Sequence, residues 1–535
     1  MHQVDAKQDI FTALEYLNEV GAALSQEKDI NRLLEIILTA ATKITNADGG
    51  TLYRVMDGQL NFEIVLNKSL NIQLGGTTGN PIPFPPLPLH FADGSANNSM
   101  IAAYVALNAE SVNIADAYVA DGFDFSGTRN FDKQTGYRST SFLTIPMQNH
   151  EGEIIGVLQL LNAQNSAGQV VAFTTEDQRL AESLASQAAI ALTNRMLITQ
   201  LETLFESLIQ LINNAIDDKS PYTGAHCERV PTLTMMIADA ASNAQHGSLA
   251  GFSMNDRERY ELKIAGLLHD CGKITTPVHV VDKATKLETI FDRIEFVAQR
   301  FEILKRDAEI KFLRAEITDA DYAATLKQID DDRLFLRRMN IGGERRAEPV
   351  LQSDLARIKK IAAQTFINEH HEATAFLDDD ELNCLSIVAG TLNATERGII
   401  NHHIDATIKM LEALPWPKHL KNVPEYAGGH HERMDGRGYP RGLTREQMSI
   451  PARIMGIADI FEALTARDRP YKPGKTLSES LNILGNFKLN GHIDPDLFDI
   501  FIREKIYLKY AEQFLDAEQI DHVDEAMIPG YVPTL

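Results

Sequence analysis

Cysteine is scarce in this sequence. Only three of its 535 residues are cysteines, Cys227, Cys271 and Cys384, and no two of them form a CxxC pair. So few cysteines cannot build a disulfide framework, and such usage is typical of proteins in a reducing compartment. We therefore expect all three to be ordinary thiols.

Long apolar runs are also lacking. The shortest helix that can span a membrane has about 18 residues, nearly all of them apolar. No uncharged apolar stretch of that length occurs here. The first residues, MHQVDAKQDIF, have neither the basic start nor the apolar run of a secretory signal. The sequence therefore predicts no membrane segment and a cytoplasmic location.

Positive charge is in short supply. Lys and Arg number 51 against 74 Asp and Glu, so the net charge is -23. This balance argues against binding a nucleic-acid polymer or an anionic membrane surface. An anionic ligand would need a local site made by metal ions or by a small cluster of Arg and Lys. Hydrophobic residues at 44% and charged residues at 23% are ordinary for a folded globular protein.

The length of 535 residues predicts roughly two to four domains. In the first of these, amphipathic helices are expected at 9–26 and 29–45 because apolar residues recur there at helical spacing. A long region at 73–135 looks irregular, as binding loops often do. The β-rich segments that we expect to be strands are 49–56, 60–67, 141–149 and 153–163, with a hairpin turn at Asn149–Gly152. The pattern predicts an α/β domain built on an antiparallel sheet.

The order of these elements resembles a GAF domain over about residues 9–194. The resemblance is carried by IAAYVALNAESVNIADAY, TGYRSTSFLTIPMQNHEGEIIGVLQLLN and FTTEDQRLAESLASQAAIALTN. It implies a sensor domain at 1–195 that takes an unidentified small molecule. Some cyclic-nucleotide-binding GAF domains carry Asn-Lys, Phe and Asp-Glu. Of these, Asn162, Phe173 and Asp177 are present, whereas Ala163 and Gln178 replace the Lys and Glu. A ligand sensor and an inert or dimerising domain both stay open.

A seam of apolar residues continues past the GAF-like region, at alternating spacings of four and three. Its members are Leu197, Leu201, Leu204, Leu208, Leu211 and Ala215. This spacing is typical of a parallel coiled coil, so we expect a signalling helix at 196–218 that joins two copies into a homodimer. A helix packed on its own domain would show a similar stripe.

The remainder, 219–535, is predicted to be an all-α domain. Within it His and Asp recur at helix-compatible positions, and such side chains are ligands of first-row transition metals. Any single histidine is more often an ordinary surface or core residue. His269 and Asp270 differ because they end the apolar run IAGLLHDCGK. A carboxylate buried there needs a partner, and a divalent metal would serve.

Three strings in this domain, HDCGK, HHERMDGRGYPRGL and ADIFEALTARDRPYK, resemble the HD-GYP branch of the HD-domain metal-dependent phosphohydrolases. The resemblance covers about residues 215–524 and implies hydrolysis of cyclic di-GMP to pGpG or GMP, together with contacts to GGDEF-domain partners. It also implies two divalent ions per subunit, iron or alternatively manganese. The ligands that it implies are His226, His269, Asp270, His403, His430, His431 and Asp459, with Asp270 shared by both ions.

Neighbouring residues refine this assignment. His403 is chosen over His402, the fallback, because HIDATIKML aligns with the family's stretch after that ligand. Tyr222 stands where some members carry a Glu for a third metal, so two metals are expected. The pair His370-His371 begins another HHE string, but no GxGYP follows, so it is interpreted as a helix surface.

The resemblance also gives roles to charged and loop residues. Lys273 is expected to act beside Asp270 in catalysis and to bind phosphate together with Arg469 and Lys472. The residues expected to shape a loop beside the paired histidines are Glu432, Gly436, Gly438, Tyr439 and Pro440.

The spacing of the ligands points to an insertion. His269 and His403 lie 134 positions apart, and the segment at about 290–383 reads as charged amphipathic helices. These helices could form an arm that contacts a dimer partner or covers the site, or a solvated spacer.

Three functions follow from the sequence. The first is a metal-dependent cyclic di-GMP phosphodiesterase regulated by the GAF domain. The second is a catalytically silent receptor that binds the nucleotide and passes a signal to a partner. The third is a hydrolase of another cyclic dinucleotide, such as cyclic GMP-AMP, or of a mononucleotide.

Overall fold

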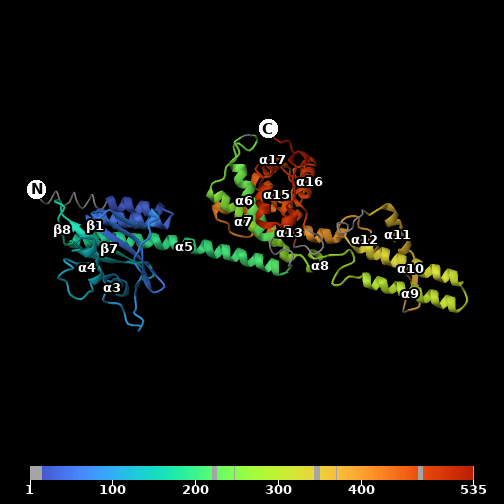
Figure 1. Ribbon diagram of the computed structural model, residues 1–535, viewed down its shortest axis with the longest axis horizontal. Coiled ribbons are helices and arrows are strands. Elements are labelled where there is room, and N and C mark those ends of the chain that lie inside the picture. The colour runs from blue at the N-terminus through green and yellow to red at the C-terminus, as the bar shows by residue number, and fades with distance from the viewer. Residues whose placement is uncertain are drawn as a thin grey trace. The chain divides into compact units, whose positions relative to one another are not determined.

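The computed structural model describes residues 15–219, 226–245, 247–342, 350–368, 370–467 and 474–533. The chain divides into two compact units, Met1–Phe205 and Glu206–Leu535. Helix α5 (Thr175–Lys219) begins in the first unit and ends in the second (Figure 1). Among the described residues, no helix combines the length and the hydropathy needed to cross a membrane.

The first unit is built on an antiparallel sheet with the strand order β3-β2-β1-β7-β6-β5. Two short strands, β4 (Leu87–Pro88) and β8 (Val170–Val171), pair with β2 and β7. The other strands are β1 (Ala47–Met56), β2 (Gln59–Asn67), β3 (Ile72–Gly75), β5 (Val112–Ile114), β6 (Phe142–Gln148) and β7 (Ile154–Gln164). The four strands expected from the sequence are therefore confirmed. The hairpin turn is confirmed as well, because the Asn149 N–H donates to the Glu153 carbonyl at 2.9 Å.

Alternating side chains give the sheet two buried faces. Leu158 and Leu160 of β7 enter one core, whereas Val157 and the partly buried Leu161 enter the other. This alternation is what the period of two along a strand dictates. Residues 15–26, α2 (Ile30–Ile44) and the first part of α5 pack on the first core. Asp29 caps α2 by accepting the Arg32 N–H, and Leu34, Ile37 and Leu38 fill its buried stripe.

The region expected to be irregular, 73–135, contains α3 (Ile101–Asn108), β5 and α4 (Ser126–Thr135), so that prediction was wrong in part. Helix α3 is short and almost wholly apolar, and α4 is mostly polar. Neither therefore shows the mixed periodicity by which an amphipathic helix is recognised. Residues of α3 contribute to the second core, which lies on the opposite face of the sheet from α2.

The second unit is mostly helical. Its helices before the insertion are α6 (His226–Ser242), α7 (Asp256–Leu268) and the short α8 (Val278–Val281). After the insertion come α13 (Ala394–Glu412), α14 (Val423–Gly428), α15 (Ile450–Thr465), α16 (Leu477–Leu489), α17 (Pro495–Arg503) and α18 (Ile506–Phe514). Helix α15 is central because it packs against α6, α14 and α16, and its Ile457, Ala458 and Phe461 are fully buried.

The insertion has a core of its own. Helices α9 (Ile294–Leu313) and α10 (Asp319–Asn340) run side by side (Figure 1), and α11 (Gln352–Ala362) and α12 (Asp379–Leu385) complete it. Its buried residues include Phe301, Leu336, Met339, Ile358 and Phe376. The charged amphipathic helices expected here are confirmed in α9, α10 and α11.

Two expectations for this unit need correction. The domain is not wholly α, because β9 (Thr365–Ile367) and β10 (Ala373–Ala375) form a hairpin inside the insertion. The pair His370-His371 lies in the hairpin turn and not on a helix, with His371 at a φ of 62°. The Asn368 side chain holds this turn by accepting the N–H groups of His370 and Glu372 at 2.9 and 3.0 Å.

Candidate metal centre

The candidate ligands come from five parts of the second unit. His226 is the first residue of α6, His269 and Asp270 follow the end of α7, and His403 lies in α13. His430 and His431 follow α14, and Asp459 lies in α15. The structure brings all seven together.

Gly272 allows the close contact that joins two of these parts. A Cβ atom on Gly272 would lie 2.0 Å from the His403 carbonyl oxygen, so any larger residue would push this turn away from α13. The Gly272 N–H donates to the Thr407 hydroxyl at 2.9 Å. Asp270 and His403 are thereby held next to each other, although they are far apart in the sequence.

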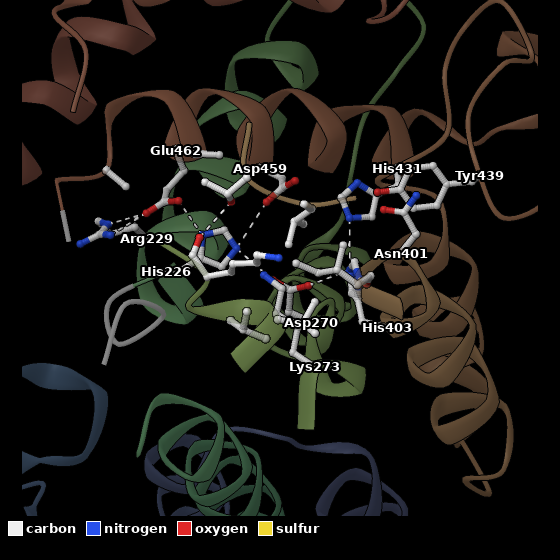
Figure 2. A pocket seen from close by; sticks show the side chains of 18 residues that line it. His226, Arg229, Asp270, Lys273, Asn401, His403, His431, Tyr439, Asp459 and Glu462 are labelled. Carbon is white, nitrogen blue, oxygen red and sulfur yellow. Dashed lines mark hydrogen bonds and ion pairs between the residues drawn. The ribbon is translucent and has the colours of Figure 1, made fainter. Parts of the chain in front are cut away.

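The first group of side chains surrounds one oxygen of Asp270. Asp270 Oδ2 lies 3.0 Å from His226 Nε2 and 3.2 Å from His269 Nε2. The two Nε2 atoms are 3.2 Å apart, and Asp459 Oδ1 lies 3.3 Å from His226 Nε2. Figure 2 shows His226 with Glu462 on one side and Asp270 and Asp459 on the other.

The second group lies at the other oxygen of the same carboxylate. Asp270 Oδ1 is 3.3 Å from His403 Nε2, which in turn is 3.2 Å from His431 Nε2. One ring nitrogen each of His403, His430 and His431 lies within 4.8 Å of the other two. Asp270 therefore stands between both groups, one oxygen toward each.

Hydrogen bonds behind the rings fix which nitrogen carries a proton. The Nδ1–H groups of His269, His403 and His430 donate to the carbonyls three residues earlier, at 2.7, 2.6 and 2.6 Å. In the neutral ring Nε2 then keeps its lone pair, the form in which imidazole binds a metal. The Nε2 atom of His430 is buried and has no hydrogen-bond partner in the described part of the chain.

Electrostatics favour neutral imidazoles at His430 and His431. Burial, together with the nearby His431 and His269, lowers the pKa of His430 well below its usual value. Burial lowers the pKa of His431 to about 4, although Asp459 opposes this shift. The Nε2 atoms of His403 and His431 lie 3.2 Å apart, and neutral imidazole nitrogens this close can be ligands of one first-row transition metal ion. The donor set therefore fits divalent metal ions.

Two residues that the sequence analysis missed support His226. Glu462 accepts the Nδ1–H of His226 at 2.5 Å, and its other oxygen accepts Arg229 at 2.7 Å. Burial opposes protonation of His226, but Glu462, Asp270 and Asp459 raise its pKa well above the usual value. Glu462 follows Asp459 by three positions on α15, so the helical spacing was the signal that could have revealed it.

Lys273 also lies where the resemblance placed it. Its Nζ is 2.5 Å from Asp270 Oδ2, and burial of Asp270 is outweighed by Lys273 and His269, which lower the pKa of that carboxyl well below its usual value. Arg469 and Lys472 lie outside the described residues, as does Tyr222. His402 is exposed and pairs with Asp405 at 3.3 Å, so only His403 of this pair reaches the site.

The loop at 430–443 wraps around its own glutamate. Glu432 accepts the N–H groups of Arg441 and Leu443 at 2.8 and 2.9 Å. A Cβ atom on Gly438 would lie 2.4 Å from the backbone at Glu432, so only glycine fits there. Tyr439, which precedes Pro440, stacks on the ring of His431 with centroids 4.8 Å apart. Gly436 has a φ of 73°, which favours glycine.

A cavity of about 390 Å³ opens on the candidate ligands. Lys273, Asn401 and Tyr439 line it together with His226, Asp270, His403, His431 and Asp459 (Figure 2). Residues that lead into and out of the insertion, Val280, Val281, Lys283, Thr391 and Leu392, form another part of the wall. The cavity can therefore place a ligand against the centre, and the insertion is attached at its edge.

Comparisons with known proteins identify both units. A GAF domain model matches residues 29–192, and two HD domain models match residues 223–363 and 380–497. The chain is therefore a GAF–HD protein, with a GAF domain followed by an HD domain. The resemblance stated from the sequence is thereby confirmed.

Three curated relatives illustrate the similarity of this GAF–HD protein. The 3'3'-cGAMP-specific phosphodiesterase 3 of Vibrio cholerae is 37% identical over 297 residues, 56% of this chain and 38% of that protein. A cyclic di-GMP phosphodiesterase of Pseudomonas aeruginosa is 37% identical over 114 residues, 21% and 26% of the two chains. The 3'3'-cGAMP-specific phosphodiesterase 1 of Vibrio cholerae is 47% identical over 81 residues, 15% and 19%. The chain spans 38% or less of each relative's length.

The GAF domain of this GAF–HD protein holds a cavity of about 460 Å³. Aromatic rings of Tyr53, Phe62, Phe84, Phe125, Phe131 and Phe142 line it, and Asp124 is its only charged lining residue within the described part. The residues that match the cyclic-nucleotide pattern do not line it. Asn162 accepts the Thr140 N–H at 2.7 Å, Phe173 lies in the core, and Asp177 accepts the Thr174 N–H at 2.8 Å. These residues support the fold.

Proposed function

We propose that this GAF–HD protein is a metal-dependent phosphodiesterase that hydrolyses cyclic di-GMP. The position of Asp270 carries the proposal, because its two oxygens face two separate groups of buried histidines. Curated relatives named as phosphodiesterases of cyclic dinucleotides support it. The product would be pGpG or GMP.

We propose two divalent cations, iron or alternatively manganese. His226, His269, Asp270 and Asp459 would hold the first, and Asp270, His403, His430 and His431 the second. When bound, the cations would supply Lewis acidity and positive charge at the scissile phosphate. Imidazole and carboxylate donors suit either metal.

The side chains of the chain would supply position and charge. Phosphoryl transfer passes through a loose transition state, so catalysis depends on positioning and on neutralising charge. Lys273, at the edge of the cavity, would contact a phosphate oxygen once cations share the charge of Asp270. Arg469 and Lys472 are proposed as further phosphate contacts. Glu462 would keep His226 oriented, with Nε2 toward Asp270.

A second substrate, 3'3'-cGAMP, is favoured by one observation. The relative whose alignment covers 56% of this chain is named for that dinucleotide. Both molecules carry two phosphodiester linkages and differ in one base. The metal centre alone would not distinguish them, so both belong in the same assay.

The test uses the full chain, purified without oxygen and loaded with Fe(II) or Mn(II). Its hydrolysis of cyclic di-GMP and of 3'3'-cGAMP is measured. Asp270→Asn should lose both metals and at least roughly a thousandfold in turnover, because one carboxylate serves both groups. The matched control is Asp405→Asn, an exposed residue of α13. Full activity in Asp270→Asn would contradict the proposal, and so would absence of turnover in the metal-loaded natural chain.

We also propose a role for the first unit. Its cavity would take an uncharged, largely apolar ligand, since no cation lines it within the described residues. The ligand would regulate the second unit through α5, whose exposed leucines would pair in a homodimer. A GGDEF-domain partner is proposed from the family resemblance.

A further inference from the structure

A second cavity, of about 380 Å³, lies against the candidate metal centre. Its walls come from the loop at 430–443, from α15 and from the turn before α17. The lining residues that matter here are His430, Arg433, Arg437, Ile460 and His492. His431, Tyr439, Asp459 and Ala463 line both this cavity and the larger one. The candidate centre therefore opens on two adjacent cavities that have these four lining residues in common.

The cations of the larger cavity are already paired with carboxylates. Lys273 contacts Asp270 at 2.5 Å, Arg229 contacts Glu462 at 2.7 Å and Lys283 contacts Glu396 at 2.6 Å. Each of these positive charges is offset locally. A phosphate that lies away from the metal centre would therefore find no unpaired cation among these three side chains.

The second cavity supplies such a cation in Arg437. Its guanidinium has no carboxylate within ion-pair distance in the part of the chain that the structure describes, and its side chain is exposed. Arg433, next to it, pairs with Asp435 at 2.8 Å, but its Nε is buried and has no hydrogen-bond partner among the described residues. Two guanidinium groups thus face one carboxylate partner here.

The loop backbone keeps Arg437 at this cavity. Asp435 Oδ1 accepts the N–H of Arg437 at 3.0 Å, and the N–H of Asp435 donates to the Gly491 carbonyl at 2.9 Å. The N–H of Met434 donates to the His492 carbonyl at 3.3 Å. The loop is therefore tied to the turn that carries His492, so the guanidinium is attached to a fixed backbone.

We infer that the cavity lined by Arg437, Arg433 and His492 binds the second phosphate of a cyclic dinucleotide while the scissile phosphate lies at the metal centre. The inference rests on the proposed function. A cyclic dinucleotide carries two phosphodiester charges, and the one that is not cleaved must also be held by a chain of net charge -23. A guanidinium matches the geometry of phosphate oxygens and donates more than one hydrogen bond to them.

Arg437→Gln tests the inference, and Arg441→Gln is the matched control. Arg441 lies on the same loop, pairs with Glu412 at 3.0 Å and lines neither cavity. The ligands are cyclic di-GMP and GpG, the linear dinucleoside monophosphate that keeps both guanines but has one phosphodiester. Arg437→Gln should raise the KM and the Kd for cyclic di-GMP roughly tenfold, the loss expected for a charge-assisted hydrogen bond. The Kd for GpG should change less than about twofold.

Two other results for these variants would each overturn the inference. An equal affinity of Arg437→Gln and Arg441→Gln for cyclic di-GMP would overturn the inference. Equal weakening for GpG would also overturn it, because Arg437 would then contact a guanine. Hydrolysis of bis(p-nitrophenyl) phosphate, which has one phosphate, reports on the metal centre and should stay unchanged. If the natural chain binds cyclic di-GMP without hydrolysing it, the proposed function fails and the Kd values still decide the inference. If it binds none, both fail.

Discussion

Glu462 shows how one carboxylate fixes a metal-ligand candidate from behind. It is fully buried, and burial alone would raise its pKa, yet His226 and Arg229 lower it to about 2. The side chain is therefore ionised at any pH where the protein works. A charged acceptor at Nδ1 holds the His226 ring in one orientation and increases the basicity of Nε2.

We predict that Glu462→Gln weakens metal binding roughly 10- to 100-fold, since an amide keeps the shape of the side chain but not its charge. Competition with a chelator, followed by metal analysis, measures the change. Turnover at saturating metal should fall less. Glu446→Gln, at an exposed glutamate of the same unit, is the control. Equal metal affinity in both variants would show that the contact between Glu462 and His226 is only structural.

Among single residues, the sequence predicted the site residues that lie inside recognisable motifs. It missed residues whose contacts join positions far apart in the sequence. Glu462 has no string of its own, and Lys283 pairs with Glu396 across 113 positions. The choice between His402 and His403 depends on the phase of α13, which puts one ring 69% exposed and the other 5%. Only the packing of Gly272 on α13 explains why the second ring meets Asp270.

Helix α5 is the element whose surface stays apolar in a single chain. Leu197, Leu201, Leu204, Leu208 and Leu211 are between 45% and 66% exposed. Each exposed leucine leaves apolar surface in water, and a partner helix with the same seam would cover all of them. The exposed seam thus favours the homodimer over a helix packed on its own domain.

We predict that Leu204→Glu separates the proposed homodimer into single chains. A carboxylate in the seam would have to be buried without a partner, which should raise the dissociation constant by roughly a hundredfold or more. Analytical ultracentrifugation across a concentration series measures it. Thr199→Glu, which adds the same charge to an exposed position of α5 off the seam, should leave the mass unchanged. A natural chain that sediments as a monomer at every concentration would contradict the prediction.

Elements were predictable where their periodicity was long enough. The four long strands β1, β2, β6 and β7 and the helices α9 and α10 show it clearly, and the structure has them close to the expected positions. Helix α3, with eight residues, and strands β9 and β10, with three residues each, are too short for any period to appear. Their conformation is decided by the core that they cover and by the turn at Asn368.

On the scale of the whole molecule, the net charge of -23 disfavours anionic ligands in either unit unless local cations offset it. An anion must overcome this charge locally, and we propose that the second unit does so with metal ions, Lys273 and Arg437. The cavity of the first unit has no such cation among the described residues, and its one lining carboxylate, Asp124, would repel a phosphate. We therefore expect a cyclic nucleotide to be a poor ligand for the GAF domain and an uncharged aromatic molecule to be a good one.

We predict that N-phenyl-1-naphthylamine, a neutral fluorescent probe, binds the GAF cavity of the full chain, and that millimolar cyclic GMP does not displace it. Thr51→Phe should weaken probe binding at least roughly fivefold, because Thr51 lines the cavity and the ring would fill it. The probe could also bind the exposed seam of α5, so Leu204→Glu is the control and should keep full binding. Displacement by cyclic GMP would show that the cavity accepts an anion and that charge does not select its ligand. Equal binding by Thr51→Phe and the natural chain would place the probe elsewhere.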